Sequence, residues 1–188
     1  MIRVFFAIKP PQETLEQIED ATKVLKKSIP NAIKWVSSNT IHITLKFIGS
    51  FNPNHNKSIE GDLNKVLLNY GSLIFSIGKI GVFPNLKKPK IICLRVDENS
   101  QMNYFVKVIN SITSDLGYEN EKRAFYPHLT IGRVKNSFPY SERHRIGQKT
   151  VNYQVPHIDK VEVNKLNLIK STLTQKGPNY TILYEIDL

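Results

Sequence analysis

The chain has 188 residues, the size of one ordinary domain or of two closely merged small lobes, which excludes a multidomain scaffold. With 40% apolar and 22% charged residues, it can build a core and is not a disordered chain. Lysine and arginine total 26 against 16 acidic residues, so the formal net charge is +10. This charge favours a polyanionic partner such as nucleic acid or an acidic surface.

Cysteine content and the lack of long apolar runs indicate the compartment. Cys93 is the only cysteine, which excludes an internal disulfide and a cysteine-based metal cluster and suits a reducing compartment. No apolar run approaches the roughly 20 residues of a membrane helix, and the first residues resemble a strand rather than a signal peptide. We therefore expect a cytoplasmic protein with no membrane partner.

The first elements in chain order are a strand and a helix. A strand-like apolar run covers residues 4–8 and is followed by two prolines. Apolar residues or threonine then recur at steps of three and four from Leu15 to Ile29, as on one face of a helix. Acidic residues occupy the first half and lysines the last turns, which suits the helix dipole, and Pro30 is expected to end the helix.

A second strand and helix repeat this pattern. Residues 91–96 form another strand-like run, and five core positions from Met102 to Leu116 repeat the first helix with a constant offset of 87. Ser100 is the expected N-cap and Gly117 the expected stop. Each helix is followed by a His-x-Thr triplet, at residues 42–44 and 128–130. The chain is therefore expected to be α+β, with two similar lobes made from a duplicated strand-helix-strand unit.

The remaining segments are assigned from the same kinds of pattern. Residues 58–68 have helical spacing, 73–82 resemble a strand, and 139–147 are expected to form a short helix. Residues 161–169 and 180–188 alternate apolar and polar residues around a Gly-Pro-Asn turn. We expect them to pair as a hairpin that closes a sheet. The whole chain, residues 1–188, is expected to form a single bilobal domain.

The positive charge is concentrated in two stretches. Residues 79–95 carry a net charge of +5, residues 122–149 carry +6, and the rest of the chain sums to −1. Basic surface combined with aromatic rings is suited to phosphate binding and base stacking. Lysines outside these stretches are expected to matter little. The aromatic residues in and beside the stretches are Phe83, Phe125, Tyr126, Phe138 and Tyr140.

The two triplets are the candidate catalytic residues. On a strand, His42 and Thr44 share one face with Lys46, and Phe47 lies on the apolar face, while His128 and Thr130 project together from the second triplet. Two imidazoles suit phosphodiester cleavage, because one takes a proton from water and the other protonates the leaving oxygen. The threonine hydroxyls stabilise the nonbridging phosphate oxygens. An imidazole pKa of about 6.5 allows both roles near neutrality without a metal ion.

At these residues the sequence resembles the 2H phosphoesterase superfamily, specifically its RNA 2′,3′-cyclic phosphodiesterase branch, long called 2′-5′ RNA ligase. Residues 3–8 resemble the first strand of the family, and Trp35-Val36 with residues 42–49 resemble its first signature. Residues 125–133 resemble the second signature, with Gly132 where the family often has alanine. The tail from residue 168 to 180 is similar to the closing hairpin of the family.

The resemblance implies antiparallel sheets from two lobes that line a central groove, with helices outside. It implies opening of an RNA 2′,3′-cyclic phosphate to a 2′-phosphate with no metal ion or cofactor, and a weak reverse reaction that forms a 2′-5′ bond. The implied partner is an RNA with such an end, for example a tRNA fragment, and the chain is expected to act as a monomer. We assign His42 as general acid to O3′ and His128 as base for water.

Further site residues are expected close to the two triplets in sequence. Arg133 is expected to bind phosphate, although strict alternation places it opposite Thr130 unless the strand bulges. Lys46 could contact phosphate, and Phe47 and Tyr126 could stack on a base, although the apolar face favours a core role for Phe47. Two alternative functions stay open, a non-catalytic basic RNA-binding module and a phosphodiesterase of small cyclic nucleotides. His55, His144 and His157 are expected on the surface and Cys93 in the core.

Overall fold

The computed structural model describes residues 2–29, 31–68, 70–97, 99–175 and 177–188, and it is an α+β fold with two antiparallel sheets. Its elements are β1 (Ile2–Ile8), α1 (Gln12–Ser28), β2 (Ile33–Trp35), η1 (Ser38–Thr40), β3 (Ile43–Phe51), η2 (Pro53–His55), α2 (Asn56–Leu67), β4 (Leu73–Phe83), β5 (Ile91–Val96), α3 (Ser100–Asp115), β6 (His128–Val134), α4 (Tyr140–Val151), β7 (Ile158–Val163), β8 (Lys165–Thr174) and β9 (Gly177–Asp187). No helix in the described ranges is long and apolar enough to cross a membrane.

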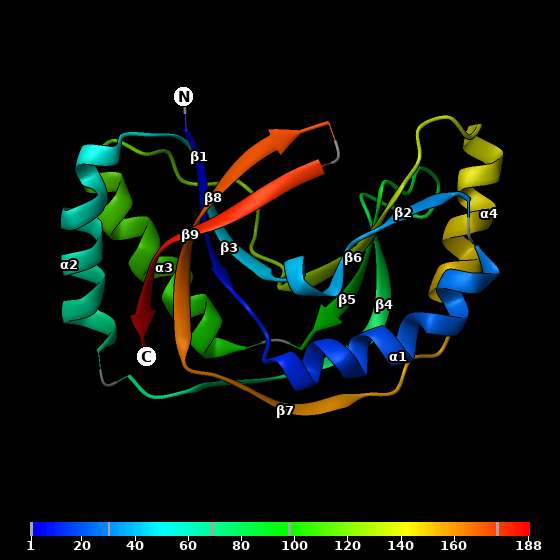
Figure 1. Cartoon of the computed structure of the whole chain (residues 1–188), viewed down its shortest axis with the longest axis horizontal. Helices are drawn as coiled ribbons and strands as arrows, with labels where there is room; N and C mark the ends of the chain where they lie inside the picture. The colour runs from blue at the N-terminus through cyan, green and yellow to red at the C-terminus, as the bar shows by residue number, and fades with distance from the viewer. Residues whose placement is uncertain (1, 30, 69, 98, 176) are drawn as a thin grey trace.

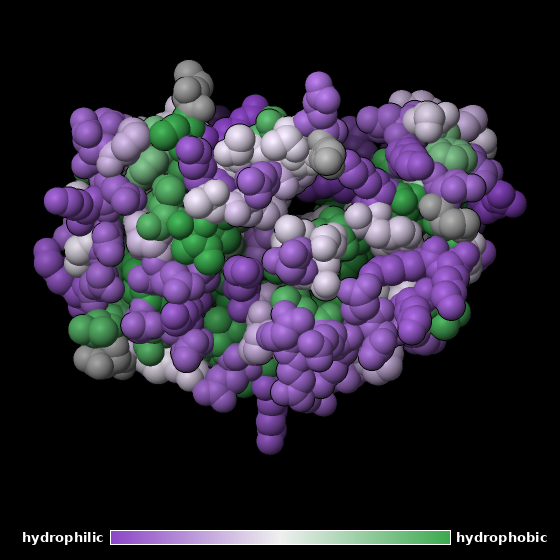
Figure 2. Space-filling model, viewed as in Figure 1, coloured by the Kyte–Doolittle hydropathy of each residue, from purple (hydrophilic) through white to green (hydrophobic). Residues whose placement is uncertain are grey.

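The molecule has two lobes, as the sequence predicts (Figure 1). The first lobe contains the sheet β3-β1-β8-β9, against which α2 and α3 pack. The second lobe contains the sheet β2-β6-β5-β4-β7 together with α1 and α4. The lobes exchange elements, because α1 follows β1 yet packs in the second lobe, and α3 follows β5 yet packs in the first. Figure 2 shows that the surface is hollowed between them.

The two long helices form where the periodicity predicts. Leu15, Ile18 and Leu25 of α1 are buried. This helix ends at Ser28, and Pro30, the expected terminator, lies outside the described residues. The prediction that Ser100 caps α3 is wrong, because the Asn99 side chain accepts the hydrogen bond from the Met102 amide at 2.9 Å and Ser100 is the first helical residue. Gly117 follows the helix with a φ of +84°, as a helix stop requires.

The C-terminal strands form a hairpin, but one predicted strand is divided. The sequence predicts one strand over residues 161–169, yet residues up to Val163 belong to β7 in the second lobe and residues from Lys165 belong to β8 in the first. The chain crosses between lobes at this point, where two consecutive polar residues, Asn164 and Lys165, interrupt the alternation. The hairpin of β8 and β9 then extends toward the second lobe, where a β-carbon built on Gly177 would lie 3.7 Å from Lys34 Nζ.

Both His-x-Thr segments are followed by a β-bulge. Thr44 pairs with Ala7 and Lys46 with Phe6, so one extra residue, Leu45, is inserted after the threonine. In the second lobe Cys93 pairs with Thr130 and Ile92 with Gly132, which inserts Ile131 at the same place. Because a bulge shifts the side-chain alternation by one residue, it reverses the faces of all residues that follow.

Candidate active site

Each histidine of the two triplets is anchored by the same local hydrogen bond. His42 Nδ1 lies 2.8 Å from the Thr40 carbonyl oxygen, and His128 Nδ1 lies 2.8 Å from the Tyr126 carbonyl oxygen. A carbonyl can only accept, so Nδ1 carries hydrogen in both rings. In each ring Nε2 is therefore the nitrogen left for a substrate, as a base when the ring is neutral and as an acid when it is protonated.

Aromatic rings hold the histidines in place. His42 stacks on Phe5 of β1, with ring centroids 4.9 Å apart and planes 28° apart, and the Tyr180 ring of β9 meets it edge-on at 5.3 Å. The His128 ring lies 4.9 Å from that of Phe83 at the end of β4. These contacts fix the ring planes without using Nε2.

The electrostatic surroundings of His42 include charged residues of both lobes. Burial lowers the pKa of His42, and the positive charges of Lys9, His128 and Arg133 lower it further, while the Thr40 carbonyl opposes the shift. Residues from both lobes thus act on one imidazole. The groove between the lobes concentrates positive charge at the point where a phosphate would bind.

The bulges decide which residues accompany the histidines. Thr44 and Thr130 lie on the groove faces of β3 and β6, and no hydrogen bond from either hydroxyl is found among the described residues. After the bulge at Ile131, Gly132 faces the core, and Arg133 is exposed on the same side as Thr130. The bulge thereby removes the conflict between the expected role of Arg133 and strict alternation. Arg133 also lowers the pKa of Tyr180, against the larger opposite effect of burial, so the two lie within electrostatic reach.

The comparison with known proteins is decisive for the family. The RNA 2′,3′-cyclic phosphodiesterase of Methanocaldococcus jannaschii is 32% identical over 189 residues, which cover 98% of this chain and 99% of that protein. The chain belongs to this family. The Aquifex aeolicus RNA 2′,3′-cyclic phosphodiesterase is 28% identical, with 93% of each chain covered. The family model described as LigT like Phosphoesterase matches residues 8–93, which include the first triplet.

Solved structures of other proteins have the same fold as this member of the RNA 2′,3′-cyclic phosphodiesterase family. The TT0787 protein of Thermus thermophilus superposes with a TM-score of 0.78 at 22% identity, covering 99% of this chain and 97% of that one. Escherichia coli LigT complexed with 3′-AMP has a TM-score of 0.74 at 20% identity, covering 100% and 98%. The bilobal α+β arrangement predicted from the sequence is therefore that of LigT like phosphoesterases.

The side chain of Lys46 does not lie on the face of β3 that strict alternation predicts. The bulge at Leu45 turns it away from His42 into the core, where it is 2% exposed. Its Nζ donates to Thr113 Oγ1 and to Asn120 Oδ1, both at 2.7 Å, and burial lowers its pKa. Lys46 ties β3 to α3 and to the segment after it, so the predicted contact with phosphate is wrong.

The same bulge exposes Phe47. Its side chain is 59% exposed, so the preference for a core role is wrong. Its ring centroid lies 5.6 Å from that of Phe5, the ring on which His42 stacks. The contact of Phe47 with a base remains a prediction. Tyr126 is also exposed, just before His128. Both rings are thus accessible near a histidine of one of the two triplets.

Two residues of the site were not singled out from the sequence. Lys9 directly follows β1 and acts on His42, and Tyr180 contacts both the His42 and Phe5 rings. Their signal was weak, because Lys9 is one of many lysines and Tyr180 lies 138 residues from His42 in sequence. Only the pairing of β1 with β3 and β8, and of β8 with β9, brings them together.

The other histidines make their contacts outside the two triplets, and Cys93 pairs with Thr130 across β5 and β6. Cys93 is buried, as expected, and burial raises the pKa of its thiol to about 11. His144 Nδ1 lies 2.9 Å from the Leu86 carbonyl, and His157 pairs with Asp159 at 3.0 Å. His55 lies 2.9 Å from the Tyr118 hydroxyl. In the described part of the chain, no three His, Cys, Asp or Glu residues are grouped as a metal site requires.

Proposed function

We propose that the protein hydrolyses RNA 2′,3′-cyclic phosphate ends to 2′-phosphates without a metal ion. The observation that carries the proposal is the pair of histidines from repeated segments, each with Nδ1 bound to the carbonyl two residues before it. Such anchoring leaves both Nε2 atoms for proton transfer. The family relatives named RNA 2′,3′-cyclic phosphodiesterase support the same substrate.

In the proposed reaction, His128 Nε2 takes a proton from water as its oxygen attacks phosphorus. The bond from phosphorus to O3′ breaks, and His42 Nε2 gives its proton to O3′, which leaves a 2′-phosphate and a 3′-hydroxyl. Thr44, Thr130 and Arg133 donate hydrogen bonds to the nonbridging oxygens as their charge grows. When the 5′-hydroxyl of a second RNA takes the place of water, the same displacement with the same histidine roles breaks the bond to O3′ and forms a 2′-5′ bond, weakly. The two histidines exchange roles only when that 2′-5′ bond is cleaved back to the cyclic phosphate.

The surroundings of His42 bear on its role as acid. Burial lowers its pKa, so the protonated ring is a minor form of the free enzyme near neutral pH. The bound cyclic phosphate carries a negative charge that favours the protonated ring. Substrate binding thus loads the acid at the position where O3′ leaves.

The terminal base is proposed to stack on Phe47 or Tyr126, and the RNA strand to follow the basic stretches of the second lobe. There Lys88 Nζ lies 4.7 Å and the Arg143 guanidinium 5.2 Å from the Tyr140 ring centre, which forms a basic and aromatic surface. We also propose that residues 1–188 act as one bilobal unit and as a monomer. A tRNA fragment as substrate and a cytoplasmic location, suited to a single buried cysteine, complete the proposal.

The test is a product assay on an oligonucleotide that ends in a 2′,3′-cyclic phosphate. We expect a 2′-phosphate, unchanged activity in excess EDTA, and loss of activity in His42→Ala and His128→Ala with the fold retained by circular dichroism. A 3′-phosphate product would mean that O2′ leaves in place of O3′, and that the acid therefore protonates O2′. Full activity in either variant would overturn the proposal, and tight RNA binding without turnover would favour the non-catalytic module.

A further inference from the structure

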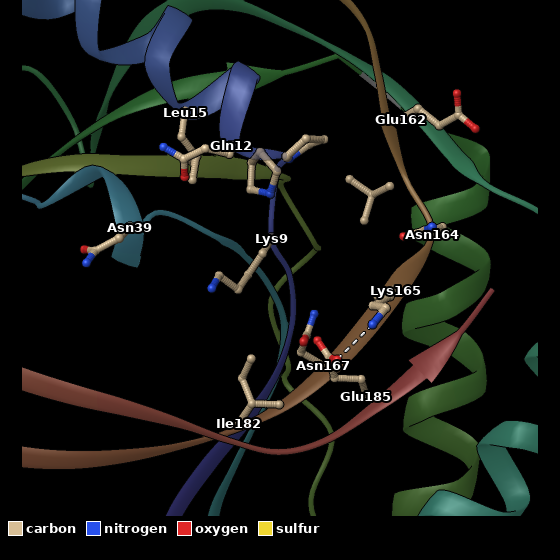
Figure 3. Close-up of a pocket in the computed structure, with 13 residues that line it drawn as sticks. Lys9, Gln12, Leu15, Asn39, Glu162, Asn164, Lys165, Asn167, Ile182 and Glu185 are labelled. Carbon is tan, nitrogen blue, oxygen red and sulfur yellow. Dashed lines mark hydrogen bonds and ion pairs between the residues drawn. The ribbon is translucent and has the colours of Figure 1, made fainter.

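A cavity of about 360 Å³ opens between the start of α1 and the strands β8 and β9 of the first lobe (Figure 3). Its walls come from the start of α1, from η1, from the junction of β7 and β8, and from β9. Lys9, which acts on His42, lines it. The cavity therefore adjoins the proposed phosphate position, yet none of the residues assigned to the reaction belongs to it.

The strand register places the cavity relative to the phosphate. Thr44 pairs with Ala7, and Ala7 pairs with Asn167, so the three residues form one row across β3, β1 and β8 on the same face. Two strand spacings separate Thr44 from Asn167, about 10 Å. A group bound at Asn167 would thus belong to a part of the substrate beyond the reacting phosphate itself.

Asn167 is an unpartnered polar side chain inside this cavity. It is 3% exposed, and its Oδ1 has no hydrogen-bond partner among the residues that the structure describes. Figure 3 shows the side chain at the floor of the cavity, beside Lys165 and Glu185, which pair at 3.0 Å. A buried carboxamide without a partner is unusual and calls for a ligand that bonds to it.

The charge and polarity of the lining indicate the kind of ligand. Lys9 and Lys165 are balanced by Glu162 and Glu185, so this lining is neutral in a chain of net charge +10. A neutral site does not favour a phosphate. Carboxamide side chains next to apolar side chains are instead suited to the polar edge and flat faces of a nucleobase, and the volume is that of a small-ligand site. These residues are Gln12, Asn39, Asn164 and Asn167, with Pro10 and Ile182 among the apolar ones.

We propose that this cavity binds the base of the nucleotide that precedes the cyclic end, with Asn167 as its hydrogen-bonding partner. The proposal rests on the proposed function, which assigns the terminal base to the exposed ring next to a histidine. The cavity is then available for the base of the preceding nucleotide. It makes the enzyme favour an RNA end over a free cyclic mononucleotide.

The test compares two substrates, a nucleoside 2′,3′-cyclic phosphate and a dinucleotide with the same cyclic end. For Asn167→Ala we expect the ratio of kcat/KM for the dinucleotide to kcat/KM for the mononucleotide to fall about tenfold, the size of one lost hydrogen bond. An unchanged ratio would overturn the inference while the proposed function stands. If the wild-type protein hydrolyses neither substrate, the proposed function itself fails.

A second pair of variants avoids dependence on the folding of a buried substitution. Ile182 is 41% exposed and lines the cavity, so Ile182→Trp should fill it and lower the same ratio. Leu183→Trp is the matched control, because Leu183 is the next residue of β9, is also exposed and does not line the cavity. A dinucleotide that lacks the first base should behave like the mononucleotide. If it is hydrolysed as well as the intact dinucleotide, the cavity does not bind that base.

Discussion

After the bulge, the first lobe continues with Lys46 and Phe47, and the second lobe continues with Gly132 and Arg133, 86 residues later. Phe47 and Arg133 both face the groove, so one wall offers an aromatic ring and the other a cation. The core-facing partners differ as strongly. Lys46 extends to α3, whereas a β-carbon on Gly132 would lie 2.6 Å from Ile33 Cγ2. The repeat thus preserves the backbone and histidines while giving each side of the groove its own contact.

The largest effect on activity is expected at the histidines, which the two lobes have in common. His42→Ala and His128→Ala should each lower kcat by about 10²–10⁴-fold. A substrate with sulfur in place of O3′ separates the two, because a thiolate leaves without an acid. We expect it to restore turnover in His42→Ala and not in His128→Ala. The opposite result would reverse the acid and base assignment, and His157→Ala serves as the control.

The two core-facing positions should be sensitive for opposite reasons. Lys46→Ala should lower the free energy of unfolding by about 1–3 kcal/mol, because the Thr113 and Asn120 oxygens lose their buried donor. Gly132→Ala should cost a similar amount, about 1–3 kcal/mol, because the added carbon overpacks the contact with Ile33. Urea unfolding measures both, with Lys57→Ala on the exposed face of α2 as control. An unchanged unfolding midpoint in Lys46→Ala would show that its bonds contribute nothing.

Substitutions at the two groove-facing positions, Arg133 and Phe47, should affect different kinetic constants. Arg133→Ala should lower kcat/KM about 10–100-fold for every cyclic phosphate, as expected for a lost charged hydrogen bond. Phe47→Ala should mainly raise KM, by about 10-fold, and only for substrates with a terminal base. Steady-state kinetics on a nucleotide and on its abasic analogue tests this. Equal effects on both substrates in Phe47→Ala would remove the stacking role.

Charge in the basic stretches 79–95 and 122–149 should matter more than charge elsewhere. Replacing Lys87, Lys88 and Lys90 with glutamine should weaken oligonucleotide binding about tenfold and flatten its dependence on salt. Replacing the exposed Lys23, Lys27 and Lys57 changes the net charge equally and should have little effect. If both triple variants bind equally weakly, only total charge matters and no strand follows the basic stretch 79–95.

The smallest effect concerns the pKa of His42. Because folding lowers this pKa, the unfolded chain binds a proton at a higher pH than the folded one, and stability falls as pH decreases below about 6.5. The slope from this one group is at most about 1.4 kcal/mol per pH unit. His42→Gln, which does not titrate, should remove that part of the slope in urea unfolding between pH 5 and 7.5. An identical slope in the variant would contradict the shift.

Local patterns predicted most of the elements and singled out the two His-x-Thr triplets, and pairing between strands decided the rest. The positions of α1 and α3 follow from helical spacing, and the His-x-Thr triplets are visible in one dimension. The bulge at Leu45 depends on how β3 meets β1, so the faces of Lys46 and Phe47 were reversed. Asn167 becomes notable only because segments far apart in sequence surround it.

The exchange of elements between lobes has a mechanical consequence. The backbone passes from one lobe to the other between β1 and α1, β2 and β3, α2 and β4, β5 and α3, α3 and β6, and again between β7 and β8. Opening the groove would therefore require several crossings to bend together, since no single linker acts as a hinge. The separation of the two imidazoles is therefore set by the fold as a whole.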